Sequence, residues 1–447
     1  MFRIFWLCSI RCILFIIERR ISWLWKQVFM GKICNWIKNL FCSSKTEFEE
    51  MEAYKASYHN PSTANTANKG IREFLANYPR WRGSVELMYR SKNTNNRLEF
   101  GEKLYGDILI IFSACLGKGT LLTADNLKLL EGELTYFDAK TDYRFNYDEV
   151  ICFNLGLLWH KLGTEYYDKA VAAFKKYIFS TLSQSNNIAY GIRECYAFKP
   201  ITNWLYYSLM NGELNLSSPT TFNDPFDCPI LQLLEGVDDD IAKLISKAYG
   251  SCLKIVCFMS NKKLPTAEDF RGIAKHEGDA PEYLNELMWA HYADYHKGIC
   301  IKYHFEAEQT KLPKSTNMVV SYFRDVVYKD DISLLGNDGN INMVDAFFVK
   351  SKAWEYENEL RYLYFDLNGS GDHQQIGIPN CISAIYFGLR CIDNDRKLIM
   401  DLMKGKKWTT IERTIDTPDK VVEHDVEFFN IVRDKKCFGK LVAEAIV

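Results

Sequence analysis

The chain has 447 residues, enough for two or three domains at about 100–200 residues each, and with 47% apolar and 25% charged residues it is not disordered. Its formal net charge of −2 excludes an overall basic field for nucleic-acid binding. The 14 cysteines include no CxxC pair. This excludes a zinc ribbon and favours a reduced, cytoplasmic compartment.

Residues 1–45 differ from the rest of the chain, because they carry eight basic side chains against one acidic one, a net charge of +7. The apolar run Ile4–Ile17 is shorter than the roughly 18–20 residues that span a bilayer. Ile21–Phe41 then interleaves tryptophans with lysines, a pattern typical of cationic helices at membrane interfaces. We expect a basic amphipathic segment that contacts the inner membrane peripherally. The alternative is that translation starts at Met30 or Met51.

Residues 46–69 are predicted to form a linker, because the stretch 56–69 (ASYHNPSTANTANK) is small, polar and unpatterned. Helical periodicity then dominates residues 70–187. Leu98–Leu116 predicts a buried helix, and Thr123 with Asp125 can cap the next one. A later stretch resembles one tetratricopeptide unit, but a solenoid needs about three, so we expect an ordinary helical hairpin. This helical domain is a candidate docking surface for a partner protein.

Residues 188–447 follow a polar break, Ser183–Asn187, and have a different character, with short β-type runs alternating with helices. The predicted strands are Leu214–Leu216, Leu253–Phe258, Gly298–Tyr303, Met318–Tyr322, Glu359–Phe365 and Ile382–Phe387. The predicted fold class is therefore α+β: a helical N-terminal half of weakly tetratricopeptide-like hairpins, followed by a mixed α+β domain.

Four segments of this second domain carry specific motifs: Tyr196–Lys199 (YAFK), Ser217–Asp227 (SSPTTFNDPFD), Met288–Cys300 (MWAHYADYHKGIC) and Trp354–Arg361 (WEYENELR). They resemble the bacterial domain-of-unknown-function 2971 family over about residues 190–390. The family usually has K-Y-R at the first site, where this sequence ends in Lys199. Because lysine lacks the planar fork of arginine, any grip on a phosphate or carboxylate would be weaker there.

The last of these motifs predicts a cluster of charge. An extended strand would place Glu355, Glu357, Glu359 and Arg361 on one face, because side chains alternate with period two. Together with a cation ending a first strand and serines ending a second, this looks like the R-S-E arrangement of ADP-ribosyltransferases.

That resemblance implies a role for each residue. Lys199 would bind NAD as a co-substrate, and Ser217 or Ser218 would steady the catalytic carboxylate. The candidate catalytic residues are Glu359, which would stabilise the oxocarbenium-like transition state, and Glu357, which would orient the acceptor. Cleavage of the bond to nicotinamide builds positive charge on the ribose, which a nearby carboxylate stabilises. The alternative is that the glutamates form a solvated strand face paired with Arg361 and lysines.

Five further candidate contacts of NAD are Asn223, Asp224, His291, Tyr292 and Arg361. Asn223 and Asp224 lie in a turn before a proline, which could border a nucleotide pocket or serve only as a rigid elbow. Tyr292 offers a ring for stacking, and His291 is either packed or positions substrate. We expect no metal site, because His291 and His296 are five residues apart and do not share a helix face.

The sequence leaves enzymatic activity undecided between three hypotheses. The first is a toxin- or phage-defence-type effector with an NAD-dependent ADP-ribosyltransferase or NAD glycohydrolase domain, acting on a protein or nucleic-acid target. The second is a non-catalytic sensor whose pocket binds a nucleotide or a partner. The third is a hydrolase or nuclease that uses His291 with Asp224 or Glu357.

Overall fold

The computed structural model describes residues 47–90, 95–140, 147–183, 193–224, 226–228, 239–260, 282–306, 318–330, 343–412 and 418–446. The basic segment 1–45 lies outside these residues. The chain divides into two compact units, which we call unit 1 (Met1–Asn146) and unit 2 (Tyr147–Val447). Within the described ranges, no helix is both long and apolar enough to cross a membrane.

Unit 1 is helical. The helices described in it are residues 47–58, α3 (Ala64–Arg90), α4 (Asn95–Lys118) and α5 (Ala124–Asp138). The Thr123 side chain caps α5 by accepting the Asn126 N–H, as the sequence predicted. The described part of the expected linker differs from the prediction, because 47–58 and the residues from Ala64 onward are helical. The reason is a buried stripe at helical spacing, Met51, Tyr54 and Tyr58.

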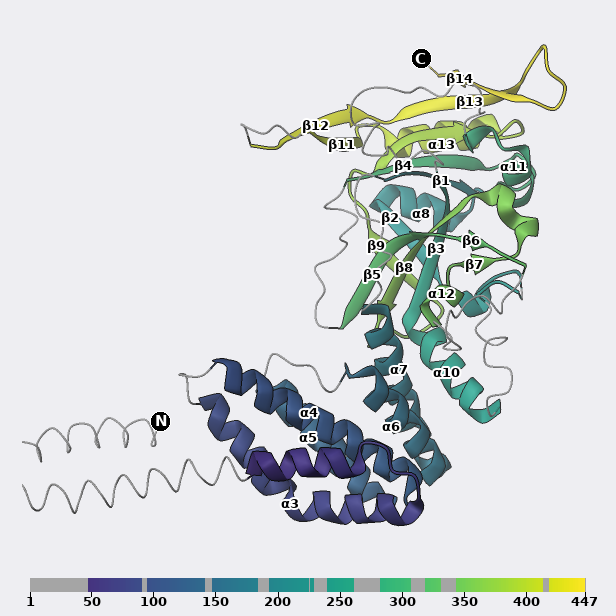
Figure 1. The fold of residues 1–447 in the computed structure, drawn as a ribbon. Coiled ribbons are helices and arrows are strands. Elements are labelled where there is room, and N and C mark those ends of the chain that lie inside the picture. Colours follow the sequence, from purple (N-terminus) through teal and green to yellow (C-terminus); the bar gives the residue numbers. More distant parts are fainter. Residues whose placement is uncertain are drawn as a thin grey trace, which may run out of the picture. The chain divides into compact units, whose positions relative to one another are not determined.

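Unit 2 begins with a helical hairpin of α6 (Glu149–Leu162) and α7 (Tyr167–Ser183), joined by η2 (Thr164–Tyr166). Gly156 lets the two helices approach, because a Cβ there would lie 2.7 Å from the Phe174 ring. Helix α7 also packs against α10 (Asp239–Cys252), and its Phe179 ring lies 6.3 Å from Phe365 in the sheet (Figure 1). The hairpin therefore belongs to unit 2, whereas the sequence placed the domain boundary after residue 187.

The centre of unit 2 is a ten-stranded sheet with the order β14-β13-β10-β4-β1-β3-β2-β9, from which β8 and β5 branch at β3. All six predicted strands are present, so the α+β class is confirmed. The sheet strands are β1 (Arg193–Lys199), β2 (Glu213–Ser217), β3 (Leu253–Ser260), β4 (Ile299–Phe305), β5 (Val319–Asp325), β8 (Glu359–Asp366), β9 (His373–Gly377), β10 (Ile382–Phe387), β13 (Glu427–Arg433) and β14 (Leu441–Ala445).

Two short ladders and several helices complete unit 2. The ladders are β6 (Val327–Tyr328) with β7 (Val349–Lys350) and β11 (Lys407–Glu412) with β12 (Lys420–Asp425). Among the described residues of unit 2, the further helices are α8 (Asn203–Asn211), α11 (Glu286–Tyr292), α12 (Met343–Ala346), α13 (Asp393–Met403), η3 (Pro219–Thr221), η5 (Glu282–Leu284) and η7 (Lys352–Glu357).

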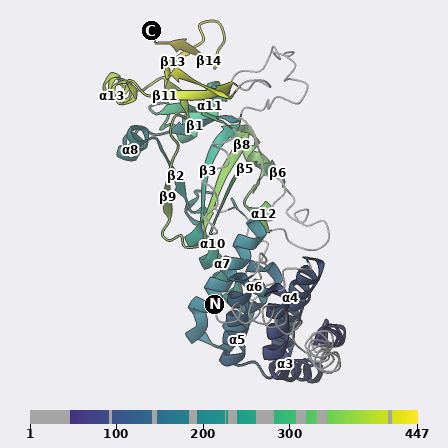
Figure 2. The same cartoon turned by 90° about the vertical axis from the view of Figure 1, so that its left-hand side faces the viewer.

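The sheet has a hydrophobic core on each face. The first core packs under α8 and α13, which lie on the same side of the sheet (Figure 2). The second core packs under α11 through Met288 and Trp289. Alternation along β1 sends Ala197 into the first core and Phe198 into the second. This assignment of faces decides which candidate residues can meet.

Strand β3 is where the sheet divides. Its ladder with β1 ends at Tyr196 opposite Met259, and it meets β2 only where Ser217 lies opposite Ile255. On its other edge β3 pairs with β8 along its length. Strands β1 and β2 therefore pair with the same edge of β3, the edge away from β8, and diverge from each other along it.

Candidate functional site

The two candidate glutamates are delivered by a bend rather than by a continuous strand. Residues up to Glu357 form the 3₁₀ helix η7, Asn358 turns the chain with φ +41°, and β8 starts at Glu359. The expectation that Glu355 shares their face is therefore wrong, and its side chain is exposed. Asn358 fits this position because a short polar side chain tolerates the left-handed region.

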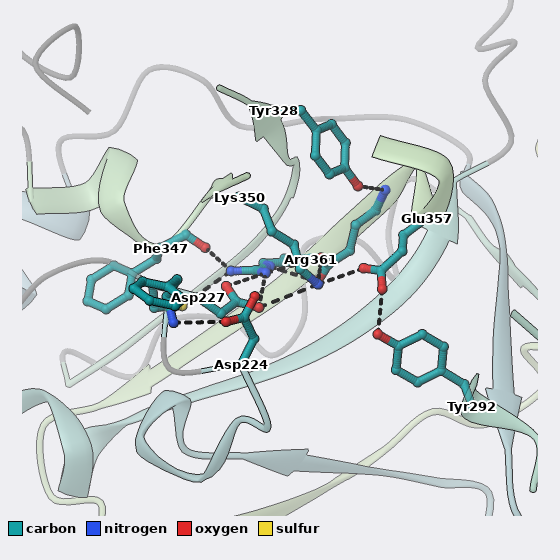
Figure 3. Close-up of polar contacts among 11 residues, drawn as sticks. Asp224, Asp227, Tyr292, Tyr328, Phe347, Lys350, Glu357 and Arg361 are labelled. Atoms are coloured by element: carbon teal, nitrogen blue, oxygen red, sulfur yellow. Dashed lines mark hydrogen bonds and ion pairs between the residues drawn. The ribbon is translucent and has the colours of Figure 1, made fainter. Parts of the chain in front are cut away.

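Arg361 is the centre of a buried ionic cluster (Figure 3). Its side chain is fully buried. The guanidinium donates to both carboxylate oxygens of Asp227 at 2.7 and 2.9 Å, and to those of Glu359 at 2.8 and 3.1 Å. It also donates to the Phe347 carbonyl at 2.8 Å. Its donors are thus directed to protein acceptors on two sides, which is the geometry of a structural anchor.

Lys350 is the second cation of the cluster. Its ammonium lies 2.6 Å from Glu357, 3.4 Å from Glu359 and 3.5 Å from Asp227. Neither Lys350 nor Asp227 was identified as a site residue from the sequence. Asp227 ends the SSPTTFNDPFD motif, which was a usable signal, whereas nothing around Lys350 in the sequence marks it.

Two tyrosines hold the glutamates in place. The Tyr292 hydroxyl on α11 donates to a carboxylate oxygen of Glu357 (Figure 3). The Tyr328 hydroxyl accepts the backbone N–H of Glu359 at 2.7 Å. Tyr292 is therefore a contact of a candidate catalytic residue, and burial together with Glu357 raises its pKa.

The cluster pushes the pKa values of its two glutamates in opposite directions. Burial raises the pKa of Glu357, and Lys350 and Tyr292 only partly oppose it. Burial also disfavours ionisation of Glu359, but Arg361 and Lys350 outweigh it and lower that pKa to about 2. Burial disfavours the Lys350 ammonium as well, yet the surrounding carboxylates hold its pKa above the usual range. Two carboxyl groups whose pKa values differ in this way can supply an acid and a base to one reaction.

The alternative of a solvated glutamate face is wrong in one respect and right in another. Glu357 and Glu359 are each only 4% exposed, so the face is not solvated. They are nonetheless paired with cations, as that alternative held. Three carboxylates against two cations leave the ionised cluster one negative charge in excess, which the raised pKa of Glu357 relieves.

Lys199 lies on the opposite face of the sheet from this cluster. Leu360 and Tyr362 of β8 enter the first core, so Glu359 and Arg361 face the other side. Ala197 also enters the first core, and Lys199 shares its face by the same alternation. The side chains of Lys199 and Glu359 therefore start from opposite faces of the sheet, and Cys257 of β3 interacts electrostatically with both of them.

Ser217 is also distant from Glu359. It lies opposite Ile255, which lies opposite Leu363, four residues along β8 from Glu359. Two strand spacings and four residues of rise place the two Cα atoms roughly 16 Å apart. The three elements of the R-S-E arrangement are therefore not gathered around one cleft.

Lys199 and Ser217 instead line one cavity of about 200 Å³ between β1, β2 and α8. Lys199 is half-buried, and burial lowers its pKa. The Ser217 hydroxyl lies 3.3 Å from His373 Nδ1 on the neighbouring strand β9. Two candidate NAD contacts, Lys199 and Ser217, thus line the same cavity. No carboxylate of the ionic cluster is among its described lining residues.

The remaining candidates have local structural roles. Ser218 is fully buried and donates to the Gly250 carbonyl at 3.0 Å. Asn223 is exposed, and the Asp224 carboxylate accepts the Phe226 N–H at 2.9 Å, which makes the expected turn an Asx turn. His291 is exposed with its ring 6.4 Å from Tyr356. Among the described residues, no hydrogen bond joins His291 to Asp224 or Glu357.

Comparison with known proteins adds one finding. The family model described as "Protein of unknown function (DUF2971)" matches residues 288–362, which supports the family resemblance over that segment. No curated protein and no solved structure matches the chain. The matched segment supplies all of the ionic cluster except Asp227, whereas Lys199 and Ser217 precede it. In the described part of the chain, no group of three or more His, Cys, Asp and Glu side chains is arranged to hold a metal ion.

Proposed function

We propose that unit 2 is a ligand-binding module of a sensor or effector, and that its ligand occupies the cavity at Lys199. The observation that carries this proposal is a half-buried ammonium at a cavity. Among the described residues, no hydrogen bond or ion pair engages this ammonium. An ammonium in such surroundings attracts an anion more strongly than one in open water.

The location of Glu357 and Glu359 favours a ligand-binding function at the Lys199 cavity over ADP-ribosyl transfer. Glu359 is paired with two cations, so its carboxylate is already engaged and is not available to a molecule held at Lys199. A group must lie within hydrogen-bond reach of the reacting atom to act as an acid or base. The cavity is therefore a binding site without a neighbouring catalytic carboxylate from the ionic cluster.

The test is thermal stability of the full chain in the presence of anions. Nucleotides, NAD and small organic acids are screened against wild type, Lys199→Ala and the control Lys397→Ala, whose side chain is exposed on α13. A ligand at 100 times its Kd adds about 2.7 kcal/mol to the free energy of unfolding. We expect at least one anion to stabilise wild type and Lys397→Ala but not Lys199→Ala. The proposal fails if no anion stabilises wild type or if Lys199→Ala responds equally.

NAD-dependent ADP-ribosyl transfer or NAD hydrolysis is a second candidate, favoured by the raised pKa of Glu357 beside Tyr292. Glu357 would then be the reactive carboxylate and Lys199 would have no direct part. Glu357→Gln should lower nicotinamide release by about 10²–10³-fold, and Lys199→Ala should leave it unchanged. Absence of release by wild type in cell extract eliminates this candidate.

We also propose docking roles for the N-terminal part of the protein. The helical unit 1 would bind a partner protein, and residues 1–45 would contact an anionic membrane. The full chain should bind anionic vesicles in a salt-sensitive way, and a chain that starts at Met51 should not. Equal vesicle binding by the two forms would contradict the membrane role.

A further inference from the structure

The cavity at Lys199 exists because two strands separate. Strand β1 leaves β3 after Tyr196, and β2 joins β3 only at Ser217. Helix α8 crosses the opening, so its Leu205 and Leu209 form one wall. The cavity thus extends from the surface of unit 2 into the first core, and its two ends have different chemistry.

The inner end is apolar. Its lining residues are all buried members of the first core: Ala197, Leu205, Leu209, Leu214, Val256, Phe258, Ile301, Tyr303 and Ile382. The Tyr303 hydroxyl is the one side-chain polar group in this set. A ligand group placed here gains about 25 cal/mol per Å² of apolar surface removed from water. A ribose hydroxyl or a phosphate here would lose water without finding enough partners, which is costly.

The outer end is polar and more exposed. It carries Lys199, Thr202, Trp204, Ser208, Glu213, Asn215 and Ser217. Among the described residues that line this end, Lys199 is the one cation and Glu213 is the one carboxylate, held 3.5 Å from the Asn211 side-chain amide. Trp204 is 67% exposed, so its indole can cover an apolar group that enters. The cation therefore sits where the apolar interior meets solvent.

We infer that the ligand of this cavity is a small carboxylic acid with an apolar chain or ring, its carboxylate at Lys199 and its apolar part in the first core. This inference rests on the proposed function, whose ligand it names by chemical class. A volume of about 200 Å³ is below the roughly 300–1,000 Å³ of pockets that enclose drug-sized ligands. A dinucleotide is therefore too large and too polar for the interior.

The experiment measures binding to the full chain by calorimetry and by tryptophan fluorescence; the chain has 10 tryptophans, so a Trp204→Phe variant identifies the part of the signal that comes from Trp204. The probes are octanoate, 3-phenylpropanoate, 1-octanol, NAD and inorganic phosphate. We expect the two carboxylates to bind saturably and 1-octanol to bind at least about tenfold more weakly, because it lacks the charge that pairs with lysine. Lys199→Ala should remove that difference, and Lys199→Arg should retain it.

Two further variants test the location of binding. Val256→Phe fills the apolar interior and should abolish octanoate binding. Because a change in the core can unfold the protein, Ser208→Trp at the half-buried outer end provides a second block that leaves the core intact. A thermal melt confirms folding of each variant, and Lys397→Ala is the matched charge control.

Each outcome supports or overturns the inferred ligand class, the proposed function or both. Octanoate binding that Lys199→Ala and Ser208→Trp weaken supports the inference. Binding of NAD or phosphate at this site without octanoate overturns the ligand class and leaves the proposed function standing. Octanoate binding that neither variant affects lies elsewhere and overturns the inference. Failure of every probe and of the wider anion screen overturns both proposals.

Discussion

At the residue scale, the ionic cluster is held by pairing rather than by solvation. Arg361, Glu359 and Lys350 are each 7% exposed or less. Removing one member of a buried ion pair leaves the other uncompensated, which costs about 3–5 kcal/mol. The members are therefore unequal in their expected effect on stability, because Glu359 contacts both cations and Glu357 contacts only Lys350.

We predict that Glu359→Gln destabilises the protein by about 3–5 kcal/mol, since it leaves Arg361 and Lys350 short of a counter-charge. Glu357→Gln should cost clearly less, because burial already raises the pKa of Glu357 and an amide oxygen can still accept from Tyr292. Urea unfolding of both variants measures the difference. Equal destabilisation would contradict the division of roles between the two glutamates.

A pH-dependent contribution is predicted at His304. Burial disfavours its charged form, but Glu194, 3.6 Å from Nδ1, and Glu306, 3.2 Å from Nε2, outweigh burial and raise its pKa above 6.5. Lys302 pairs with the same Glu194 at 3.0 Å, and the Trp408 ring lies 5.1 Å from the His304 ring. The raised pKa means that protonated His304 favours the folded state. This stability is fully present below pH 6.5 and is lost as pH rises through the folded-state pKa.

The measurement is the melting temperature of wild type and His304→Gln across pH 6–9. Wild type should lose stability as pH rises above 6.5, and the variant should have a flatter profile over that window. Identical slopes would show that His304 does not titrate as its carboxylate partners imply.

At this scale, the sequence identified three of the five charged members of the ionic cluster. Glu357, Glu359 and Arg361 could be recognised because they lie within one short motif. Asp227 is 134 residues from Arg361, so its pairing depends on tertiary packing that no local pattern encodes. The same holds for Lys350, which reaches the cluster from β7. For Lys199, the alternation of side chains along β1 already implied that it shares a face of the sheet with Ala197. The order of the strands was needed to show that Glu359 starts from the other face.

At the element scale, the turn between α11 and β4 contains a left-handed segment. Asp294, Tyr295 and His296 have φ values of +45°, +53° and +70°. Three successive non-glycine residues in this region are strained and persist only where the surroundings enforce them. Here the enforcement is backbone packing, since the Gly298 N–H donates to the Ala293 carbonyl at 2.8 Å and the Arg390 N–H donates to the His296 carbonyl at 2.9 Å.

Gly298→Ala is predicted to destabilise unit 2 by about 1–3 kcal/mol, the usual cost of overpacking. A Cβ at this position would lie 2.2 Å from the Lys199 carbonyl oxygen, which is backbone and cannot rotate away. Gly377→Ala in β9 is the control, because a Cβ there meets nothing within 4 Å. Thermal unfolding compares the two, and a neutral Gly298→Ala would mean that β1 and β4 can shift apart.

At this scale, strands could be predicted from the sequence where a short run of residues is mostly apolar. The runs that became β3 and β10 are mostly apolar, and the sheet buries them on both faces. Prediction failed at η7, where the alternating charges of WEYENELR favoured a strand. The positive φ of Asn358 ends the 3₁₀ helix there, and alternation of charge cannot distinguish that bend from a strand.

At the scale of the whole molecule, the extent of unit 2 is set by α7. The helix buries Val171, Phe174, Phe179 and Leu182, and it contacts α10, α12 and β5. A domain boundary at residue 188 would remove this helix from the sheet that it covers. The polar stretch after Ser183 is a connection within unit 2, and composition alone could not distinguish it from a linker.

We therefore predict that a fragment of residues 147–447 folds on its own, whereas residues 188–447 do not reach the same stability. Each large apolar side chain that loses its cover costs about 1.5–3 kcal/mol, against a total stability of about 5–15 kcal/mol for a domain. The shorter fragment should melt at a clearly lower temperature or aggregate, and limited proteolysis should cut it within α10. Equal melting temperatures for the two fragments would show that α6 and α7 are dispensable and that the boundary belongs at residue 188 after all.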